Sequence, residues 1–162
     1  MNWIVAVIGM LFTLNVSAMG VHSGFQGITL GSSEYVHFGY LLGLTFGDTP
    51  AIAVNAGLTH PYEFKGYHQT IYNIDACLEW TTNVLSWVKA YGGLGLGAYS
   101  DRVGASRSVI PSLVTRGGLR LGGKISAQFE MTNYFGVYSL EQLVDFTNWS
   151  RFHFFVGVSL GN

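Results

Sequence analysis

The sequence is poor in charged residues, and this scarcity limits what kind of protein it can encode. Only 10% of its residues are Asp, Glu, Lys or Arg, whereas 49% are hydrophobic. A soluble domain typically carries about 25% charged residues, most of them on its surface. This chain therefore has too few charges to cover an exterior that faces water.

Two other features are nearly absent. Beyond the N-terminus there is no run of about 18 apolar residues that could cross a bilayer as a helix. Cys77 is the only cysteine, which excludes an internal disulfide framework. The net charge of -1 gives no indication of a nucleic-acid partner. The hydrophobic residues must therefore be distributed through the chain in shorter segments.

The segment 113–131 shows how they are distributed, because polar and apolar residues alternate along it with a period of two. One face carries Arg116, Gly118, Arg120, Ser126, Gln128 and Glu130, and the other carries Leu119, Leu121, Ile125, Ala127, Phe129 and Met131. If residues 122–124 form a hairpin turn, Leu121 pairs with Ile125. In that register Arg116 lies directly opposite Glu130. The hairpin then has one apolar face and one face with an ion pair.

Eight segments have the length of strands, and all but the first alternate clearly. We expect strands at Val21–Leu30, Tyr35–Phe46, Ala51–Thr59, Thr70–Trp80, Trp87–Tyr99, Leu113–Leu121, Ile125–Val137 and Arg151–Leu160. The connections at 47–50, 81–86 and 122–124 are short, whereas those at 60–69, 100–112 and 138–150 are longer. Membrane barrels have short turns on one side and longer loops on the other. The pattern predicts an all-β, eight-stranded antiparallel up-and-down transmembrane β-barrel.

The N-terminus has the composition of an export signal. Residues 3–16 are almost continuously apolar, and Val16, Ser17 and Ala18 supply small or aliphatic residues at the usual cleavage positions. We therefore predict a signal peptide at residues 1–18 and a barrel domain at residues 19–162. No Lys or Arg precedes the apolar run, so an uncleaved anchor and a misassigned start codon are the alternatives.

Three segments carry a family resemblance: the glycine-rich strand 91–99, the hairpin of residues 118–130, and the closing strand 152–160. With these segments the chain resembles the small eight-stranded outer-membrane barrels of Gram-negative bacteria, the OmpA, OmpX and opacity-protein type. The resemblance implies export to the outer membrane, insertion by the barrel-insertion machinery, and contact with outer-membrane lipid and lipopolysaccharide. The family usually ends in an aromatic residue, whereas this chain ends in Gly161 and Asn162.

The polar face would line the interior of such a barrel, which is only wide enough to be filled by side chains. Charges there must neutralise one another. Besides Arg116 with Glu130, pairing of Trp80 with Val88 places Glu79 opposite Lys89. We expect the lumen ion pairs to comprise Arg116, Glu130, Glu79, Lys89, Asp75, Arg120 and Arg151. A structural plug is the favoured interpretation of this set, and a gate or narrow polar pathway is the alternative.

Signs of catalysis or metal binding are weak. The five histidines show no metal-ligand spacing, so we predict no metal, no cofactor and no catalytic residues. The nearest histidine and hydroxyl combinations are His153 with Ser159 and His37 with Thr45, and neither shows the close spacing found in lipid A deacylases. A lipid-modifying barrel enzyme and a soluble lipocalin-like barrel are the alternatives.

Binding is expected in the longer loops, where function is commonly located. Tyr62, Phe64, Lys65 and Tyr67 combine aromatic and charged groups suited to a host surface or another protein. Arg102 and Arg107 are suited to the anionic groups of lipopolysaccharide. The sequence thus predicts a non-catalytic outer-membrane barrel with a filled polar lumen and a structural or adhesive role.

Overall fold

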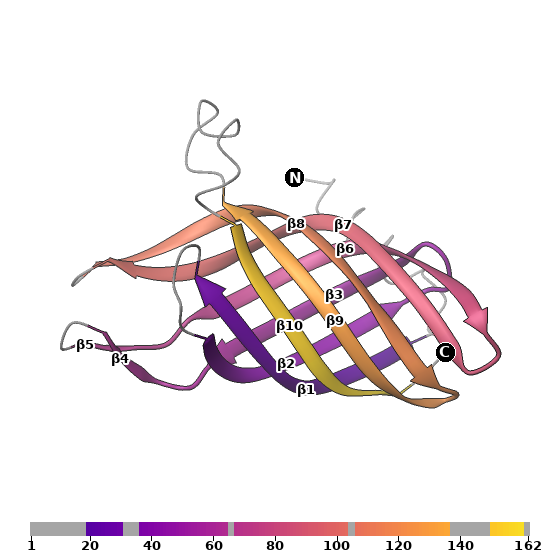
Figure 1. The fold of residues 1–162 in the computed structure, drawn as a ribbon. Helices are drawn as coiled ribbons and strands as arrows, with labels where there is room; N and C mark the ends of the chain where they lie inside the picture. The colour runs from indigo at the N-terminus through magenta and orange to yellow at the C-terminus, as the bar shows by residue number, and fades with distance from the viewer. Residues whose placement is uncertain (1–18, 31–35, 65–66, 104–105, 137–149, 161–162) are drawn as a thin grey trace, which may run out of the picture.

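The computed structural model is a closed antiparallel β-barrel, shown in Figure 1, and it describes residues 19–30, 36–64, 67–103, 106–136 and 150–160. The barrel strands are β1 (Met19–Leu30), β2 (Val36–Phe46), β3 (Ala51–Thr59), β6 (Tyr72–Leu85), β7 (Val88–Val103), β8 (Ser106–Gly122), β9 (Ile125–Gly136) and β10 (Ser150–Leu160). Their order around the wall is β1-β10-β9-β8-β7-β6-β3-β2. The predicted eight-stranded up-and-down topology is confirmed.

Burial alternates along each strand because successive side chains of a β-strand point to opposite faces. In β6, Asn73, Asp75, Cys77 and Glu79 are buried, whereas Tyr72, Ile74, Leu78 and Trp80 are each 44–55% exposed. The polar residues therefore line the lumen and the large apolar residues cover the outer wall. The first strand follows the same rule, since His22 and Gln26 are buried and Phe25 is exposed.

The two ends of the barrel differ. One end, called here the short-turn rim, carries the tight turns at residues 47–50, 86–87 and 123–124. The opposite end, called the loop rim, carries a separate hairpin of β4 (Tyr62–Phe64) and β5 (Tyr67–Gln69). In Figure 1 this hairpin and the ends of β7 and β8 project from the same side of the barrel.

The loop rim departs from the sequence prediction in two places. Residues 60–69 were expected to be a loop, but they contain the β4–β5 hairpin. Residues 100–112 were also expected to be a loop, yet β7 and β8 continue pairing until Val103 and Ser106. Two antiparallel strands satisfy each other's backbone hydrogen bonds, so the ladder extends beyond the neighbouring strands.

The register of two hairpins also differs from the prediction. In β8–β9, Gly122 pairs with Ser126, so Arg116 lies opposite Thr132 rather than Glu130. The turn is displaced by one residue toward the C-terminus, which shifts the pairing by two. In β6–β7, Trp80 pairs with Gly92 rather than Val88, because the strands continue as far as Leu85. Both shifts are even, so the side chains keep their predicted faces as far as the β-bulge between Asn83 and Leu85.

Residues 1–18 lie outside the described part of the chain, and the signal peptide remains a prediction. Within the described residues, the structure has no helix with the length and apolar character needed to cross a membrane.

Candidate functional site

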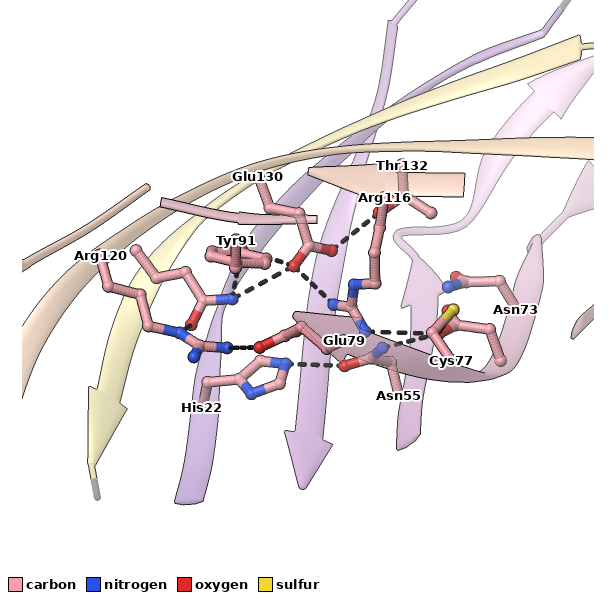
Figure 2. A network of polar contacts seen from close by, with 12 residues as sticks. His22, Asn55, Asn73, Cys77, Glu79, Tyr91, Arg116, Arg120, Glu130 and Thr132 are labelled. Atoms are coloured by element: carbon pink, nitrogen blue, oxygen red, sulfur yellow. Dashed lines mark hydrogen bonds and ion pairs between the residues drawn. The ribbon is translucent and has the colours of Figure 1, made fainter. Parts of the chain in front are cut away.

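The centre of the lumen is occupied by Arg116, whose side chain is completely buried. Its Nη2 lies 2.5 Å from Glu130 Oε2, and its Nη1 lies 3.6 Å from Asp75 Oδ1. Figure 2 shows the guanidinium pointing toward the Glu130 carboxylate. Glu130 lies in β9 and Asp75 in β6. The ion pair of Arg116 with Glu130 is thus present although the residues are not directly opposite, because the arginine side chain spans two residues along the neighbouring strand.

Glu130 is held by three further donors from two strands, β7 and β9. The Tyr91 hydroxyl donates to Oε2 at 2.7 Å, and Gln128 Nε2 donates to the same oxygen at 3.2 Å. The Thr132 hydroxyl donates to Oε1 at 2.8 Å. Charge-assisted hydrogen bonds of this kind offset the desolvation of a buried carboxylate. Glu130 is therefore fixed in position as well as neutralised.

Asp75 connects this cluster to the other side of the barrel. Asn55 Nδ2 donates to Asp75 Oδ1 at 2.7 Å, and the Tyr134 hydroxyl donates to Oδ2. Asn55 Oδ1 in turn lies 2.7 Å from His22 Nε2. The network thereby reaches from β9 and β6 to β3 and β1.

Arg120 forms the second buried ion pair. Its Nη2 lies 2.7 Å from Glu79 Oε1, and its Nε donates to Gln128 Oε1 at 3.3 Å. The guanidinium also lies over the Tyr91 ring, 4.4 Å from the ring centre, a favourable cation–π arrangement.

The predicted pairing of Glu79 with Lys89 is wrong. The shifted β6–β7 register places Glu79 opposite Gly93, and it places Lys89 opposite Asn83, nearer the short-turn rim. Glu79 pairs instead with Arg120, which reaches it from β8 across the intervening strand β7.

An apolar cluster packs beside these charges and extends from Cys77 toward the loop rim. It consists of Cys77, Tyr99, Ile110, Val114 and Tyr134, all of them buried. The Tyr99 and Tyr134 rings meet edge to face at 6.2 Å. The described interior is therefore packed with side chains, and toward the loop rim the apolar cluster is joined by the buried polar residues Thr59, Asn73, Ser100 and Ser112.

Gly57 provides space for this packing, and its replacement tests how full the lumen is. A Cβ there would lie 2.5 Å from Gln26 Nε2 and 2.6 Å from Asn73 Oδ1, which are hydrogen-bonded to each other. Gly57→Ala should therefore lower the free energy of unfolding by about 1–3 kcal/mol, as overpacking does. Gly123→Ala is the matched control, because nothing lies within 4 Å of a Cβ at that turn position. Equal urea midpoints for the two variants would show that the lumen has room to spare.

The other predicted site residues lie away from the network or outside the described part of the structure. The backbone of Arg151 in β10 pairs with Tyr134 and Leu30, and its side chain is outside the described part. Arg102 and Arg107 lie opposite each other in the β7–β8 ladder.

The aromatic loop candidates fall on the short hairpin of the loop rim. Tyr62 and Phe64 lie in β4 and Tyr67 lies in β5, where Phe64 pairs with Tyr67. Lys65 lies outside the described residues, as do the side chains of the other three.

Sequence reasoning concentrated on charged residues and missed most neutral members of the network. The missed residues are His22, Gln26, Asn55, Thr132 and Tyr134, all of them buried polar groups or hydrogen-bonded hydroxyls. The signal that could have found them was the period of two itself. A polar residue at an inward position of a barrel strand needs a partner in the lumen.

The two histidine and hydroxyl combinations are too far apart for catalysis. His37 and Thr45 lie eight residues apart in β2, and His153 and Ser159 lie six apart in β10. At about 3.4 Å per residue these separations are about 27 Å and about 20 Å. A nucleophile and its base must be within hydrogen-bond reach, so neither combination can form such a pair. Among the described residues, no group of three or more His, Cys, Asp or Glu could hold a metal ion.

No protein-family model matches this chain, and no curated protein matches its sequence. Solved structures do match its fold. Ail of Yersinia pestis, solved with the heparin analogue sucrose octasulfate, has a TM-score of 0.59 at 10% identity, covering 88% of this chain and 95% of Ail. Neisserial surface protein A has a TM-score of 0.61 at 15% identity, covering 89% and 96%. OprG of Pseudomonas aeruginosa has a TM-score of 0.57 at 9% identity, covering 89% and 95%. These similarities show the fold of the small eight-stranded outer-membrane β-barrels.

Proposed function

Starting from this fold, we propose that the chain is an integral outer-membrane protein of a Gram-negative bacterium. Its barrel is a closed, non-catalytic scaffold, and its loop rim faces the outside of the cell in a structural or adhesive role. The observation that carries the proposal is the inverted polarity of the chain. Large apolar side chains are exposed on the outer wall, whereas the ionisable side chains of Asp75, Arg116 and Glu130 are buried.

The outer wall supports residence in a membrane. Leu94 and Leu96 are more than 60% exposed, and Trp80 and Trp87 are exposed near the short-turn rim. Aromatic residues gather at membrane interfaces in this way. A soluble lipocalin-like barrel would need the opposite arrangement, with its apolar face around an internal ligand. The wall therefore favours contact with outer-membrane lipid.

The filled lumen supports a scaffold rather than a pore. The buried ion pairs lie in the middle of the barrel, and the apolar cluster around Tyr99 and Tyr134 lies toward the loop rim. A barrel of this strand number has room only for such side chains. A specific role is therefore expected outside the wall, at the hairpins that project from the loop rim.

Two partner classes fit the composition of the loop rim. Arg102 and Arg107, opposite each other in the projecting part of β7–β8, suit the phosphate groups of lipopolysaccharide. The aromatic residues of β4 and β5 suit a protein or host surface. The barrel-insertion machinery is the partner expected during assembly.

Cysteine labelling in intact cells tests the proposed orientation. In a Cys77→Ala background, Val109→Cys places a thiol on the projecting part of β8, and Lys124→Cys places one in an exposed turn of the short-turn rim. A membrane-impermeant maleimide should label Val109→Cys in intact cells and label Lys124→Cys only after the outer membrane is opened.

The same preparations test membrane residence. Folded outer-membrane barrels in detergent migrate differently on gels before and after boiling, so a heat-dependent shift is expected. Recovery in the soluble fraction without such a shift would refute the membrane assignment. Labelling of Lys124→Cys alone in intact cells would refute the orientation.

A further inference from the structure

A groove of about 560 Å³ lies on the outer wall, over strands β1, β2, β3 and β6. Ligand-binding pockets of proteins have volumes of this order. The outward-facing side chains that line the groove are Ser23, Tyr40, Leu42, Ala56, Leu58 and Tyr72. All six are exposed on the wall, so the groove opens away from the lumen and toward the surroundings of the barrel.

The groove arises where two rows of outward side chains cross β2, β3 and β6 in register. The row nearer the loop rim has three large members, Tyr40, Leu58 and Tyr72. In the next row toward the short-turn rim, Ala56 lies between Leu42 and Ile74. The alanine side chain ends at Cβ, whereas its neighbours on both sides and in the row above extend further. The wall is therefore hollowed over Ala56.

One side of the groove is held in place by aromatic contacts. The centre of the Tyr40 ring lies 5.2 Å from that of Phe25, and it meets the His60 ring edge to face at 5.0 Å. His60 is itself fixed, because its backbone N–H donates to the carbonyl oxygen of Phe38 at 2.8 Å. Aromatic pairs at such distances are stabilising. The groove is thus formed in the absence of a ligand, which reduces the ordering that binding requires.

The shape of the groove favours a lipid chain over a second copy of the protein. In a two-fold dimer the same patch of both copies packs against itself, so two hollows would face each other and enclose a void. Atoms that line a void lose their van der Waals contacts. A single fatty acyl chain is narrow, flexible and apolar, and it can fill the hollow closely. The groove is also continuous with the apolar wall, where Leu42 and Ile74 are each 55% exposed.

We infer that the groove binds one acyl chain of lipopolysaccharide. The inference rests on the proposed function, which places the loop rim, and with it the row of Tyr40 and Tyr72, in the outer leaflet, where lipopolysaccharide is the main lipid. The acyl chain lies over Ala56. The polar part of the lipid lies at the level of Tyr40 and the exposed His60, because amphipathic aromatic rings sit at the membrane interface. The surrounding lipid is equally apolar, so close packing rather than the hydrophobic effect provides the affinity.

The test is native mass spectrometry of the protein, extracted in an uncharged detergent from the outer membrane of a host whose lipopolysaccharide is truncated to a uniform mass. The wild type should carry one lipopolysaccharide molecule. Ala56→Trp fills the groove and should lower the fraction of barrels with bound lipid by about tenfold, the effect of losing roughly ten close carbon contacts.

Ala127→Trp is the matched control. It adds the same ring at an exposed position of β9, which lies four strands from β3 in either direction around the wall. It should change the bound fraction by less than about twofold, as expected for a surface substitution away from the site.

Two variants of Tyr40 test the side of the groove without filling it. Tyr40→Ala removes the ring that borders the hollow, and it should lower the bound fraction by a factor similar to that of Ala56→Trp. Tyr40→Phe keeps the ring and should retain the lipid to within about twofold. A normal heat-dependent gel shift shows that each variant is folded.

Equal losses for Ala56→Trp and Ala127→Trp would show that the lipid is held by the wall in general, and would overturn the inference. A phospholipid bound in place of lipopolysaccharide would overturn it as well, as would a wild-type barrel with a normal gel shift and no bound lipid. These results leave membrane residence intact, because that assignment fails only if the protein is soluble and lacks the gel shift. The cysteine labelling described above tests the orientation without involving the groove.

Discussion

Glu130→Ala should lower the free energy of unfolding by about 3–5 kcal/mol, the cost of leaving a buried charge without its partner. Arg116 is completely buried, and its 2.5 Å contact with Glu130 is the shorter of its two ion pairs. Asp75, at 3.6 Å, is already bound by Asn55 and Tyr134. No water can replace the lost carboxylate without entering the packed lumen.

A double-mutant cycle separates the ion pair from general loss of packing. Glu130→Ala should lower the free energy of unfolding more in the wild type than in an Arg116→Ala background. In the Arg116→Ala background there is no buried guanidinium that could lose its partner. The measurement is urea unfolding in lipid vesicles, read from the heat-dependent gel shift. If the loss of stability in the double variant equals the sum of the two single losses to within about 0.5 kcal/mol, the two residues are not coupled. Asp48→Ala, which removes an exposed carboxylate, should change stability by less than about 0.5 kcal/mol.

Leu94→Arg should destabilise the barrel by about 2–4 kcal/mol if the outer wall lies in hydrocarbon. Leu94 is 62% exposed near the middle of the β7 part of the wall, where it pairs with Leu78 and Thr115. In a soluble protein, an arginine at so exposed a position would be almost neutral. The size of the destabilisation by Leu94→Arg therefore shows whether the outer wall faces hydrocarbon or water.

Val109→Arg is the matched control for this experiment. Val109 is 70% exposed, but it lies in the part of β8 that extends beyond the neighbouring strand β9. We expect a change of less than about 0.5 kcal/mol in the same vesicle unfolding assay. Comparable small effects at both positions would contradict a membrane-embedded wall, whereas comparable large effects would place the projecting segment in the membrane too.

The faces of the strands could be predicted from the sequence because side-chain direction depends only on the local period of two. This is why the inward position of Arg116, Arg120 and Glu130 agrees with the structure although two registers were wrong. Register depends on where each turn closes. In β8–β9 the turn closes one residue later than predicted. Nothing in the sequence around the adjacent Gly122 and Gly123 distinguishes these two turn positions.

Contacts across the lumen were harder to predict than contacts between neighbouring strands. Arg120 reaches Glu79 over an intervening strand, and the sequence alone does not give the curvature that brings β6 and β8 together. The glycines of β7 are a partial signal in the sequence, because a glycine in a strand often marks a close approach by a neighbouring group. A Cβ on Gly93 would indeed lie only 3.2 Å from Arg116 Cγ. The β4–β5 hairpin had no alternation long enough to indicate it.

The polar network also determines how the barrel can come apart. The backbone ladders join only strands that are adjacent around the wall. The side chains join strands that are not adjacent, as Asn55 of β3 does with His22 of β1, and Tyr91 of β7 with Glu130 of β9. These hydrogen bonds link the strands through the lumen and so help to fix the cross-section of the barrel. A hairpin that separates from the wall must break its side-chain contacts with strands beyond its neighbours as well as its own backbone ladders. The barrel should therefore unfold as one cooperative unit rather than hairpin by hairpin.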